Sequence, residues 1–371
     1  MRKMFVAVLG VLMAISLAAC GTSDTTDPGS GEGSGKTIYV LGPTPDHGWT
    51  AQTGTFAQAR VDEINAAGTY KSQYMASSTG EAQNDIVQTI IANGDAAGVV
   101  FMALDDSAKS GQEALIAAEI PFISFDRIIE GPDKSAILNF SGDNWAVGAG
   151  IAYWLQKNGL EPGDTLITLI GDNGTVSSRR QEGFEQFLLG SRDYTDKSGE
   201  TFSTTAKWTQ EQVDTLTARY KVVCNWSADA AYQYLEQTLP DIASSGIDKL
   251  FVFSMDDEMT FGFMNLLQGN TLTDAAKKTL EDMNISISAI GGMQELYDVI
   301  AGKSDLSPIA DQYFDSLMSM YFSPQMMTTA IDYMIQYLEG DWPFNVGDGA
   351  YEPTFIVDQS NAATTTGFTG H

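Results

Sequence analysis

Aromatic rings, carboxylates and guanidinium groups recur in this sequence at or just beyond the ends of short apolar runs. A sugar presents an apolar C–H face that packs against an aromatic ring. Its hydroxyls bond to carboxylates and guanidinium groups, and such charge-assisted bonds are stronger than neutral ones. A few polar groups of this kind orient a ligand in a pocket. The candidate binding residues are Asp46, His47, Trp49, Asp126, Arg127, Arg180, Trp226 and Asp256.

Each of these residues also has a purely structural explanation. Asp126 and Arg127 could form a surface ion pair, which contributes little. Trp49 could anchor a core, and Arg180 could lie on a solvated helix face. The acidic run that begins at Asp256 suits the first turn of a helix, where negative charge is favourable. Their joint position after successive strands favours a binding site.

The elements that position these residues alternate between strand and helix patterns from Thr37 to Ile290. Repeated strand–helix units predict parallel sheets with helices on both faces. One sheet would need too many strands, so an α/β fold of two doubly wound parallel-sheet lobes fits 371 residues better. Two polar stretches, Ser191–Arg219 and Ser304–Phe322, are interpreted as irregular insertions. In open parallel sheets, ligands lie beyond the carboxyl ends of the strands.

The N-terminal residues read as an export signal rather than as part of the fold. Arg2 and Lys3 precede an apolar run, Phe5–Leu17, that is too short to span a bilayer. The run ends in Leu-Ala-Ala-Cys, which resembles a bacterial lipoprotein signal and makes Cys20 the expected lipidation site. Residues 21–35 are rich in Gly, Ser, Thr and Asp, as in a flexible tether.

Charge and cysteine content narrow the classes of function. The formal charge of −28 becomes −30 once residues 1–19 are removed, and such a surface repels nucleic acid. With Cys20 acylated, no disulfide can form, and Cys224 is expected to be a free thiol in a core. His47 and His371 are too few and too distant for a metal site. No phosphate-binding glycine loop or Gly-x-Ser-x-Gly nucleophile is present, so we expect neither enzyme nor cofactor.

The order of the motifs resembles the sugar-binding proteins of bacterial ABC importers, the group that includes the ribose- and galactose-binding proteins. The resemblance runs from about Thr37 to the C-terminal region, outside the two insertions. It implies two lobes joined by three crossover segments, with the ligand in the cleft between them. Four motifs carry it: Pro121–Arg127, Ser141–Asn144 followed by Gly148, Arg180–Phe184, and Phe253–Met259.

The resemblance also implies roles for single residues. Asp126 and Arg127 would bind sugar hydroxyls, and Arg180 would meet the sugar from the second lobe. Asp256 stands where the family usually has a ligating Asn. Trp49 resembles the aromatic contact that follows the first strand.

Further positions match the family less closely. Trp226 falls where the second lobe supplies a stacking ring, and Tyr321 falls near a crossover residue that is usually Gln, Glu or Asn. The family has a ligating Asp after the strand Ile285–Ile290, where this chain has Gly291. The hydroxyl pattern of the ligand is therefore expected to differ from that of ribose or galactose.

The resemblance also implies which partners the protein has. The implied partners are a monosaccharide or related small polyol, an importer permease, and the membrane through the lipid anchor alone, with the protein a monomer outside the cytoplasmic membrane. A sensor-coupled receptor, or a carrier for a nucleoside or furanose-like signal molecule, remains the alternative.

The expected division of the chain follows from these signals. It has a signal of residues 1–19, a tether of 20–36, a first lobe of 37–142 plus 322–345, and a second lobe of 143–321 plus 346–371.

Overall fold

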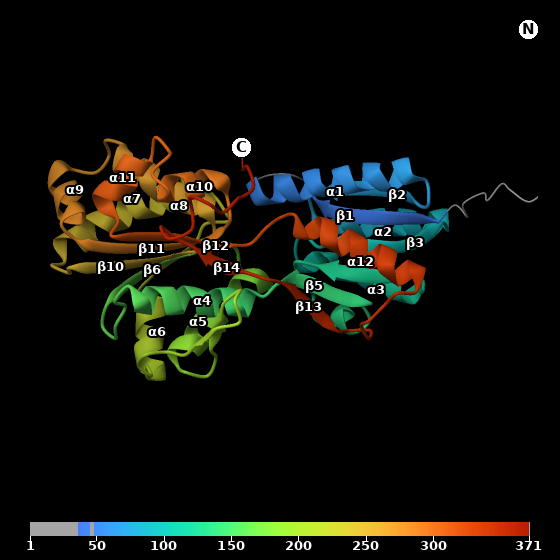
Figure 1. Cartoon of the computed structure of the whole chain (residues 1–371), viewed down its shortest axis with the longest axis horizontal. Helices are drawn as coiled ribbons and strands as arrows, with labels where there is room; N and C mark the ends of the chain where they lie inside the picture. The colour runs from blue at the N-terminus through green and yellow to red at the C-terminus, as the bar shows by residue number, and fades with distance from the viewer. Residues whose placement is uncertain (1–35, 45–47, 371) are drawn as a thin grey trace, which may run out of the picture.

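The computed structural model describes residues 36–44 and 48–370, which form two α/β lobes side by side (Figure 1). The first lobe is built on a parallel sheet with the strand order β13-β5-β4-β3-β1-β2. Its strands are β1 (Thr37–Pro43), β2 (Lys71–Ser77), β3 (Ala96–Met102), β4 (Phe122–Phe125), β5 (Leu138–Gly142) and β13 (Gly349–Glu352).

Helices cover both faces of the first sheet, which is why its strands are apolar at successive positions. Neighbouring side chains of a strand point to opposite faces. Ile38 and Val40 of β1 pack into one core cluster with α1 and α12. Tyr39 and Leu41 pack into a second cluster with α2 and α3. The helices are α1 (Gly48–Ala67), α2 (Gly80–Asn93), α3 (Lys109–Ala117) and α12 (Met326–Glu339), with short 3-10 turns η1 (Asp106–Ala108) and η2 (Pro132–Lys134).

The second lobe repeats this design with the strand order β14-β12-β11-β10-β6-β9, and only its edge strand β14 is antiparallel. A separate hairpin pairs β7 (Tyr194–Thr195) with β8 (Thr201–Phe202). The sheet strands are β6 (Thr165–Ile170), β9 (Tyr220–Val223), β10 (Lys249–Ser254), β11 (Asn284–Gly291), β12 (Ser316–Tyr321) and β14 (Phe355–Val357).

Helices again lie on both faces of this sheet. In Figure 1, α4 and α5 lie below the sheet, whereas α7, α8, α10 and α11 lie above it. The helices of this lobe are α4 (Asn144–Lys157), α5 (Thr175–Leu188), α6 (Gln210–Arg219), α7 (Ala228–Ser244), α8 (Asp257–Gln268), α9 (Asp274–Glu281), α10 (Gln294–Ile300) and α11 (Ser307–Tyr313).

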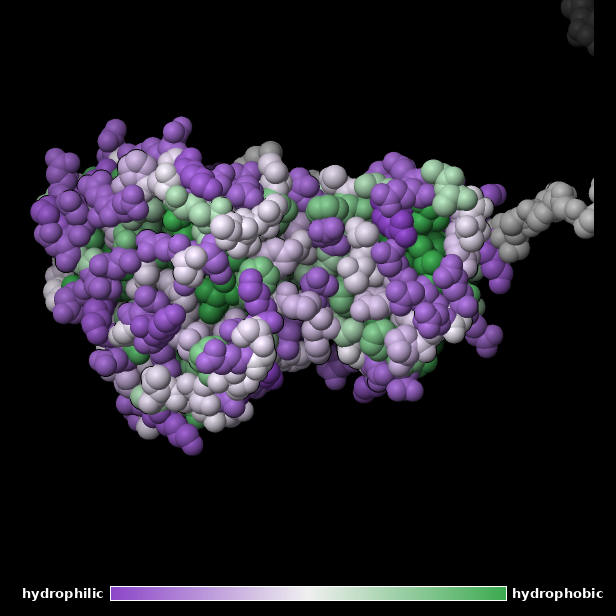
Figure 2. Space-filling view, viewed as in Figure 1, coloured by the Kyte–Doolittle hydropathy of each residue, from purple (hydrophilic) through white to green (hydrophobic). Residues whose placement is uncertain are grey.

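The chain passes between the lobes three times. β5 leads into α4, β12 leads into α12, and β13 leads into β14. The predicted fold class, two doubly wound lobes joined by three crossover segments, is therefore confirmed. On the face shown in Figure 2, hydrophilic residues cover most of both lobes.

The segment Ser304–Phe322, predicted as an irregular insertion, instead contains α11 and the sheet strand β12. Serines conceal this strand in the sequence. The Ser319 hydroxyl donates to Asp257 at 2.7 Å, and the Ser316 hydroxyl donates to Ser286 at 2.8 Å. Buried hydroxyls that have partners are tolerated inside a sheet, so hydropathy alone does not reveal β12.

The other predicted insertion, Ser191–Arg219, is partly built into the second lobe. It supplies α6, which packs on β6, and it buries Tyr194, Trp208 and Leu216. The free thiol of Cys224 is buried, as expected, and burial raises its pKa to about 11.

The boundary expected after residue 345 is also wrong. β13 pairs with β5 from Gly349, opposite Asn139, to Glu352, opposite Gly142. The first lobe therefore extends to Glu352. β13 is a short, half-exposed edge strand, and edge strands lack the continuous apolar run that marks a buried strand.

Candidate functional site

A cavity of about 330 Å³ lies between the two lobes, where strands of both sheets end. Pockets that hold small-molecule ligands have volumes of roughly 300–1,000 Å³. The cavity is at the small end of this range, which suits a single sugar ring. Six of the predicted residues line it: Trp49, Asp126, Arg127, Arg180, Trp226 and Asp256.

Strained backbone is concentrated at this cavity. Four non-glycine residues in the described part of the chain have positive φ, and three of them, Asp126, Asn225 and Trp226, line the cavity. Such conformations cost about 1–3 kcal/mol each and persist where the surroundings enforce them, often at functional sites. At Asp126, with φ of 60°, the amide donates to the Phe140 carbonyl oxygen at 2.9 Å.

The side chain of Asp126 is available to a ligand. It is buried, and its carboxylate accepts no hydrogen bond from any residue that the structure describes. Burial raises its pKa, and the nearby charges of Arg127 and Arg180 oppose this shift. Asp126 lines the cavity, so a ligand hydroxyl that donates a hydrogen bond to it would make a charge-assisted contact.

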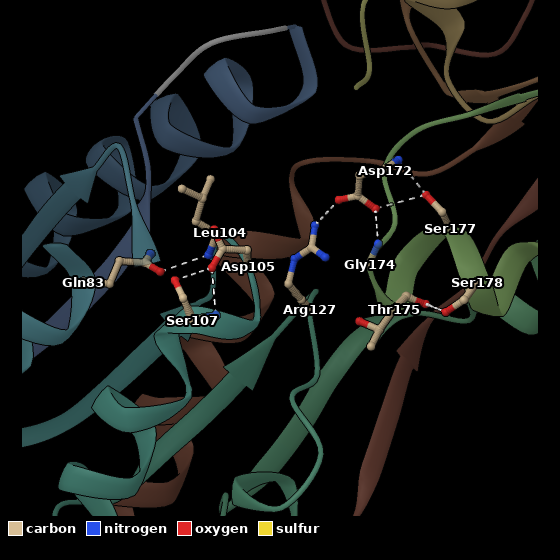
Figure 3. Close-up of polar contacts among 10 residues, drawn as sticks. All are labelled: Gln83, Leu104, Asp105, Ser107, Arg127, Asp172, Gly174, Thr175, Ser177 and Ser178. Carbon is tan, nitrogen blue, oxygen red and sulfur yellow. Dashed lines mark hydrogen bonds and ion pairs between the residues drawn. The ribbon is translucent and has the colours of Figure 1, made fainter. Parts of the chain in front are cut away.

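Arg127 links the two lobes instead of standing free (Figure 3). Its guanidinium lies 2.7 Å from the carboxylate of Asp172, which follows β6 in the other lobe. Asp172 also accepts from the Gly174 amide at 2.8 Å and from the Ser177 hydroxyl at 3.2 Å. Burial alone would raise the pKa of Asp172, but Arg127 and these hydrogen bonds together lower it below its ordinary value.

Arg180 is buried at the opposite wall and is held by the protein on two sides. Its Nε donates to Asn144 Oδ1 at 2.9 Å, and one terminal nitrogen donates to the Met255 carbonyl oxygen at 2.7 Å. Burial lowers its pKa to about 10, against the charges of Asp126 and Asp256. It remains charged at neutral pH and can also bond to a ligand.

Aromatic rings from both lobes form the apolar walls. Trp49 Nε1 donates to the carbonyl oxygen of Phe322 at 2.8 Å, and the two rings are 5.8 Å apart. Trp226 packs so closely over Gly171 that a Cβ at that glycine would lie 2.2 Å from the indole ring. Both lobes therefore contribute aromatic rings to the cavity.

The acidic run at the start of α8 divides between two tasks. Asp256 caps the helix by accepting from the Glu258 amide at 2.8 Å, and it also faces the cavity. Asp257 turns away and accepts from the amides of Gly292 and Met293, both at 2.8 Å. Burial raises the pKa of Asp256 well above its usual range, and burial raises that of Asp257 to about 6.

Asp257 also explains the absence of an acid at Gly291. A Cβ there would lie 2.7 Å from an Asp257 carboxylate oxygen, and φ is +156°. Residues with side chains rarely adopt this conformation. The wall at Gly291 is therefore bare backbone.

One predicted residue in the described part of the chain, Tyr321, is not brought to this cavity. Tyr321 stacks on Phe355 at 4.6 Å within the second lobe and does not line the cavity. Successive strand residues face opposite sides, and it is the next residue, Phe322, that faces the cavity. Asp46, His47 and the lipidation site Cys20 lie outside the described residues, as do residues 1–35.

The cavity residues that the sequence interpretation did not select include Asp105, Asp172 and Phe322. Asp172 follows β6 within Gly-Asp-Asn-Gly, so the position rule that selected Asp126 applied to it equally. Phe322 follows a strand that the sequence did not reveal.

A sequence model of the periplasmic binding protein domain matches residues 38–341, most of the chain. The chain belongs to the periplasmic binding protein family. Its inter-lobe cavity is thus the candidate solute site of a binding protein. A comparison with curated proteins gives no match.

Solved structures share the fold of this binding protein. The periplasmic binding component of the arabinose ABC transporter from Shewanella sp. ANA-3, bound to α- and β-L-arabinofuranose, has a TM-score of 0.66 and 17% identity, covering 88% of this chain and 93% of its own. A galactofuranose binding protein has a TM-score of 0.65 and 15% identity, covering 88% and 96%. A solute binding protein from Bacillus halodurans C-125 with bound myo-inositol has a TM-score of 0.65 and 17% identity, covering 90% and 98%.

Two other features were searched for in the described ranges. No group of three or more His, Cys, Asp or Glu side chains there could hold a metal ion. None of the helices in residues 36–44 and 48–370 is both long and apolar enough to cross a membrane.

Proposed function

We propose that this periplasmic binding protein captures a monosaccharide or small polyol between its lobes and delivers it to an ABC-type importer permease. The observation that carries the proposal is the inter-lobe cavity, where rings from both lobes flank free carboxylate oxygens. The arabinose- and galactofuranose-binding structures and the myo-inositol complex support it, because those proteins hold hydroxyl-rich rings in the same fold.

The polar groups of the cavity favour a ligand that mainly donates hydrogen bonds. The lining holds four carboxyl groups, Asp105, Asp126, Asp172 and Asp256, against the guanidinium groups of Arg127 and Arg180. Arg127 already pairs with Asp172, and Arg180 already donates to a backbone carbonyl oxygen, so each guanidinium has fewer donors left for a ligand. Neutral hydroxyls match this excess of acceptors, whereas an anionic ligand would be repelled.

Export and anchoring are the second part of the proposal. Membership of the family implies a location outside the cytoplasm. The lipoprotein-like signal supports attachment through Cys20 to the outer face of the membrane. Residues from both lobes of a single copy line the cavity, and the proposal takes the protein to be a monomer. Expression with radiolabelled palmitate tests the anchor: label should enter the native chain and not Cys20→Ser, and label in both would contradict it.

A thermal-shift screen of the purified full-length chain in detergent tests the solute class. The panel is L-arabinose, D-galactose, D-glucose, myo-inositol, glycerol and adenosine. A compound that binds only the folded state raises the melting temperature with its concentration. We expect a rise with at least one sugar or cyclitol that is lost in Asp126→Ala. A rise with adenosine alone would contradict the proposed solute class.

A further inference from the structure

Phe322 occupies a position that no sequence pattern indicated. It lies at the second crossover, directly after β12, and is 3% exposed. Its ring forms part of the cavity wall, and its carbonyl oxygen accepts the hydrogen bond from Trp49. Phe322 therefore contacts a ring of the first lobe while belonging to a segment that joins the lobes.

The ring of Phe322 rests on Gly142, the last residue of β5 at the first crossover. A Cβ at Gly142 would lie 2.0 Å from Cε2 and 2.6 Å from Cζ of the ring, closer than real Cβ atoms come. Gly142 does not have positive φ, so its backbone conformation does not require glycine. What the missing side chain provides is space for the ring between two crossovers.

Arg180 completes the contact from the second lobe. Its guanidinium carbon lies 4.9 Å from the centre of the Phe322 ring, within cation–π range. Its Nε is bonded to Asn144, whose amide nitrogen donates to the Gly142 carbonyl oxygen at 3.4 Å. One cavity residue thus contacts both the first and the second crossover.

We infer that Phe322 is a positioning residue that couples occupation of the cavity to the relative position of the lobes. A few residues at element ends absorb the rotation when lobes close around a ligand. A rigid ring held between Gly142, Trp49 and Arg180 makes the first two crossovers move together. A ligand that fixes Arg180 and Trp49 also fixes this ring, and so favours the arrangement in which the lobes meet.

The inference concerns regulation of the proposed solute site, but it predicts behaviour without ligand. In the structure the lobes meet where Arg127 pairs with Asp172 and where the Gly48 amide donates to Glu258 at 2.6 Å. Removal of the Phe322 ring should lower the population of this close arrangement of the lobes. Residues in contact are usually coupled energetically, so the ratio of close to separated lobes should fall about twofold or more.

Pulsed electron spin resonance on the full-length chain in detergent measures this ratio directly. Nitroxides are attached at Ala117→Cys on α3 and Gln237→Cys on α7, both exposed, in a chain carrying Cys20→Ser, while Cys224 stays buried. We expect Phe322→Ala and Gly142→Ala each to move the ligand-free distances toward longer values. Gly142→Ala in the Phe322→Ala background should add little, because the ring that it displaces is gone.

Two matched controls separate coupling from general packing. Tyr321→Ala removes the neighbouring ring of the same crossover, which stacks only within the second lobe. Gly349→Ala adds a methyl to the same sheet, where the nearest atoms are at 3.5 Å. Both should leave the distances unchanged, and urea unfolding reports the stability of every variant.

A fall in unfolding free energy with unchanged distances in Phe322→Ala and Gly142→Ala would overturn the inference and make the ring a packing residue only. The distance measurements are repeated with myo-inositol and L-arabinose, and the affinity for each compound is titrated. If either binds, Phe322→Ala should weaken it about tenfold, or about 1.4 kcal/mol. If neither they nor the other panel compounds bind, the proposed solute class fails while the ligand-free distances still decide the inference.

Discussion

The polar side chains of the cavity differ in whether the protein already supplies their hydrogen-bond partners. Arg127 is paired with Asp172, and Arg180 is bonded to Asn144 and to a backbone carbonyl. Asp126 accepts nothing from the described residues, and Asp256 uses one oxygen for its helix cap. The groups left for a ligand are therefore mainly acceptors, as a hydroxyl-rich ligand requires.

Truncating Asp126 tests this distinction. Asp126→Ala should weaken binding of a panel sugar at least about thirtyfold, since one broken contact to a desolvated charge costs roughly 2–5 kcal/mol. Stability should change little, because the carboxylate accepts no hydrogen bond from the described residues and burial raises its pKa against the charges of Arg127 and Arg180. Titration calorimetry measures the affinity, with Asp85→Ala, an exposed acid on α2, as the control.

Arg180→Ala should weaken binding to a similar extent and should also destabilise the fold. Its removal leaves Asn144 Oδ1 and the Met255 carbonyl oxygen without their donor, at about 1–3 kcal/mol for each buried group. Calorimetry and urea unfolding together measure both effects. Unchanged affinity in both Asp126→Ala and Arg180→Ala would remove the assignment.

The two tryptophans should report binding separately. Trp49 comes from the first lobe and Trp226 from the second, and both line the cavity. A ligand ring between them alters the surroundings of both indoles. Intrinsic fluorescence should therefore respond to a panel sugar, with a smaller change in Trp49→Phe and in Trp226→Phe. A response that is identical in the native chain and both variants would place the ligand elsewhere.

At the level of helices and strands, α8 illustrates how one acidic run serves binding and stability together. Asp256 ends in the cavity, and Asp257 holds the turn after β11 through two amides and the Ser319 hydroxyl. The pKa of Asp257 is about 6 in the fold against an ordinary 3.8. The folded state therefore keeps a proton that the unfolded chain has lost between these pH values.

This shift predicts a pH dependence with a definite sign. An acid whose pKa is raised in the folded state contributes stability that is fully present below its ordinary pKa. This stability is lost as the pH rises through the pKa of the folded state. At about 1.4 kcal/mol per pKa unit, Asp257 should lower the unfolding free energy by roughly 2–3 kcal/mol between pH 4 and pH 7. Urea unfolding of Asp257→Asn should lack this part of the pH dependence.

The exposed acid Asp311 on α11 provides the control. Asp311→Asn should keep the pH dependence of the native chain. If the difference in unfolding free energy between native chain and Asp257→Asn is the same at pH 4, 5.5 and 7, the role of Asp257 is wrong.

The sequence predicted those elements whose burial shows as an apolar run. β1, β3, β6 and β10 are covered on both faces, so the alternation of strand and helix, and with it the fold class, could be predicted. The ends of β4 and β10 then located Asp126 and Asp256. Asp172 obeyed the same rule but was not selected as a site residue.

The elements that were missed lack such a run. β12 carries the half-buried Ser316 and the buried Ser319 in place of apolar residues, and β13 is a half-exposed edge strand. Because β12 was not predicted, the alternation of side chains along it could not show which residue faces the cavity. Tyr321 was therefore selected, although Phe322 faces the cavity. Close approaches such as Phe322 on Gly142 join residues 180 positions apart and leave no local pattern.

The charge of the whole molecule should act on ligand choice. The chain carries a formal charge of −28, and carboxyl groups outnumber guanidinium groups in the cavity. Replacing a neutral hydroxymethyl by a carboxylate adds repulsion in a partly desolvated site. D-galacturonate should therefore bind at least about tenfold more weakly than D-galactose, and D-glucuronate more weakly than D-glucose, at about 1.4 kcal/mol per tenfold. Calorimetry at low and high salt measures this, and a preference for the acids would contradict the proposed ligand class.

The two lobes and three crossovers suit a molecule that closes around its ligand. Contacts to both lobes are complete only when the lobes meet, so a ligand that makes them must shift the equilibrium toward the closed form. An importer could recognise this form, because only then do the lobes stand in a fixed relation. We therefore expect ligand capture and lobe closure to be one event.

Small-angle X-ray scattering tests this most directly. The full-length chain in detergent is measured with and without a saturating concentration of the panel compound that raises its melting temperature most, with contrast-matched detergent. We expect a smaller radius of gyration with ligand in the native chain and no change in Asp126→Ala. An unchanged radius of gyration in the native chain at saturation would contradict it.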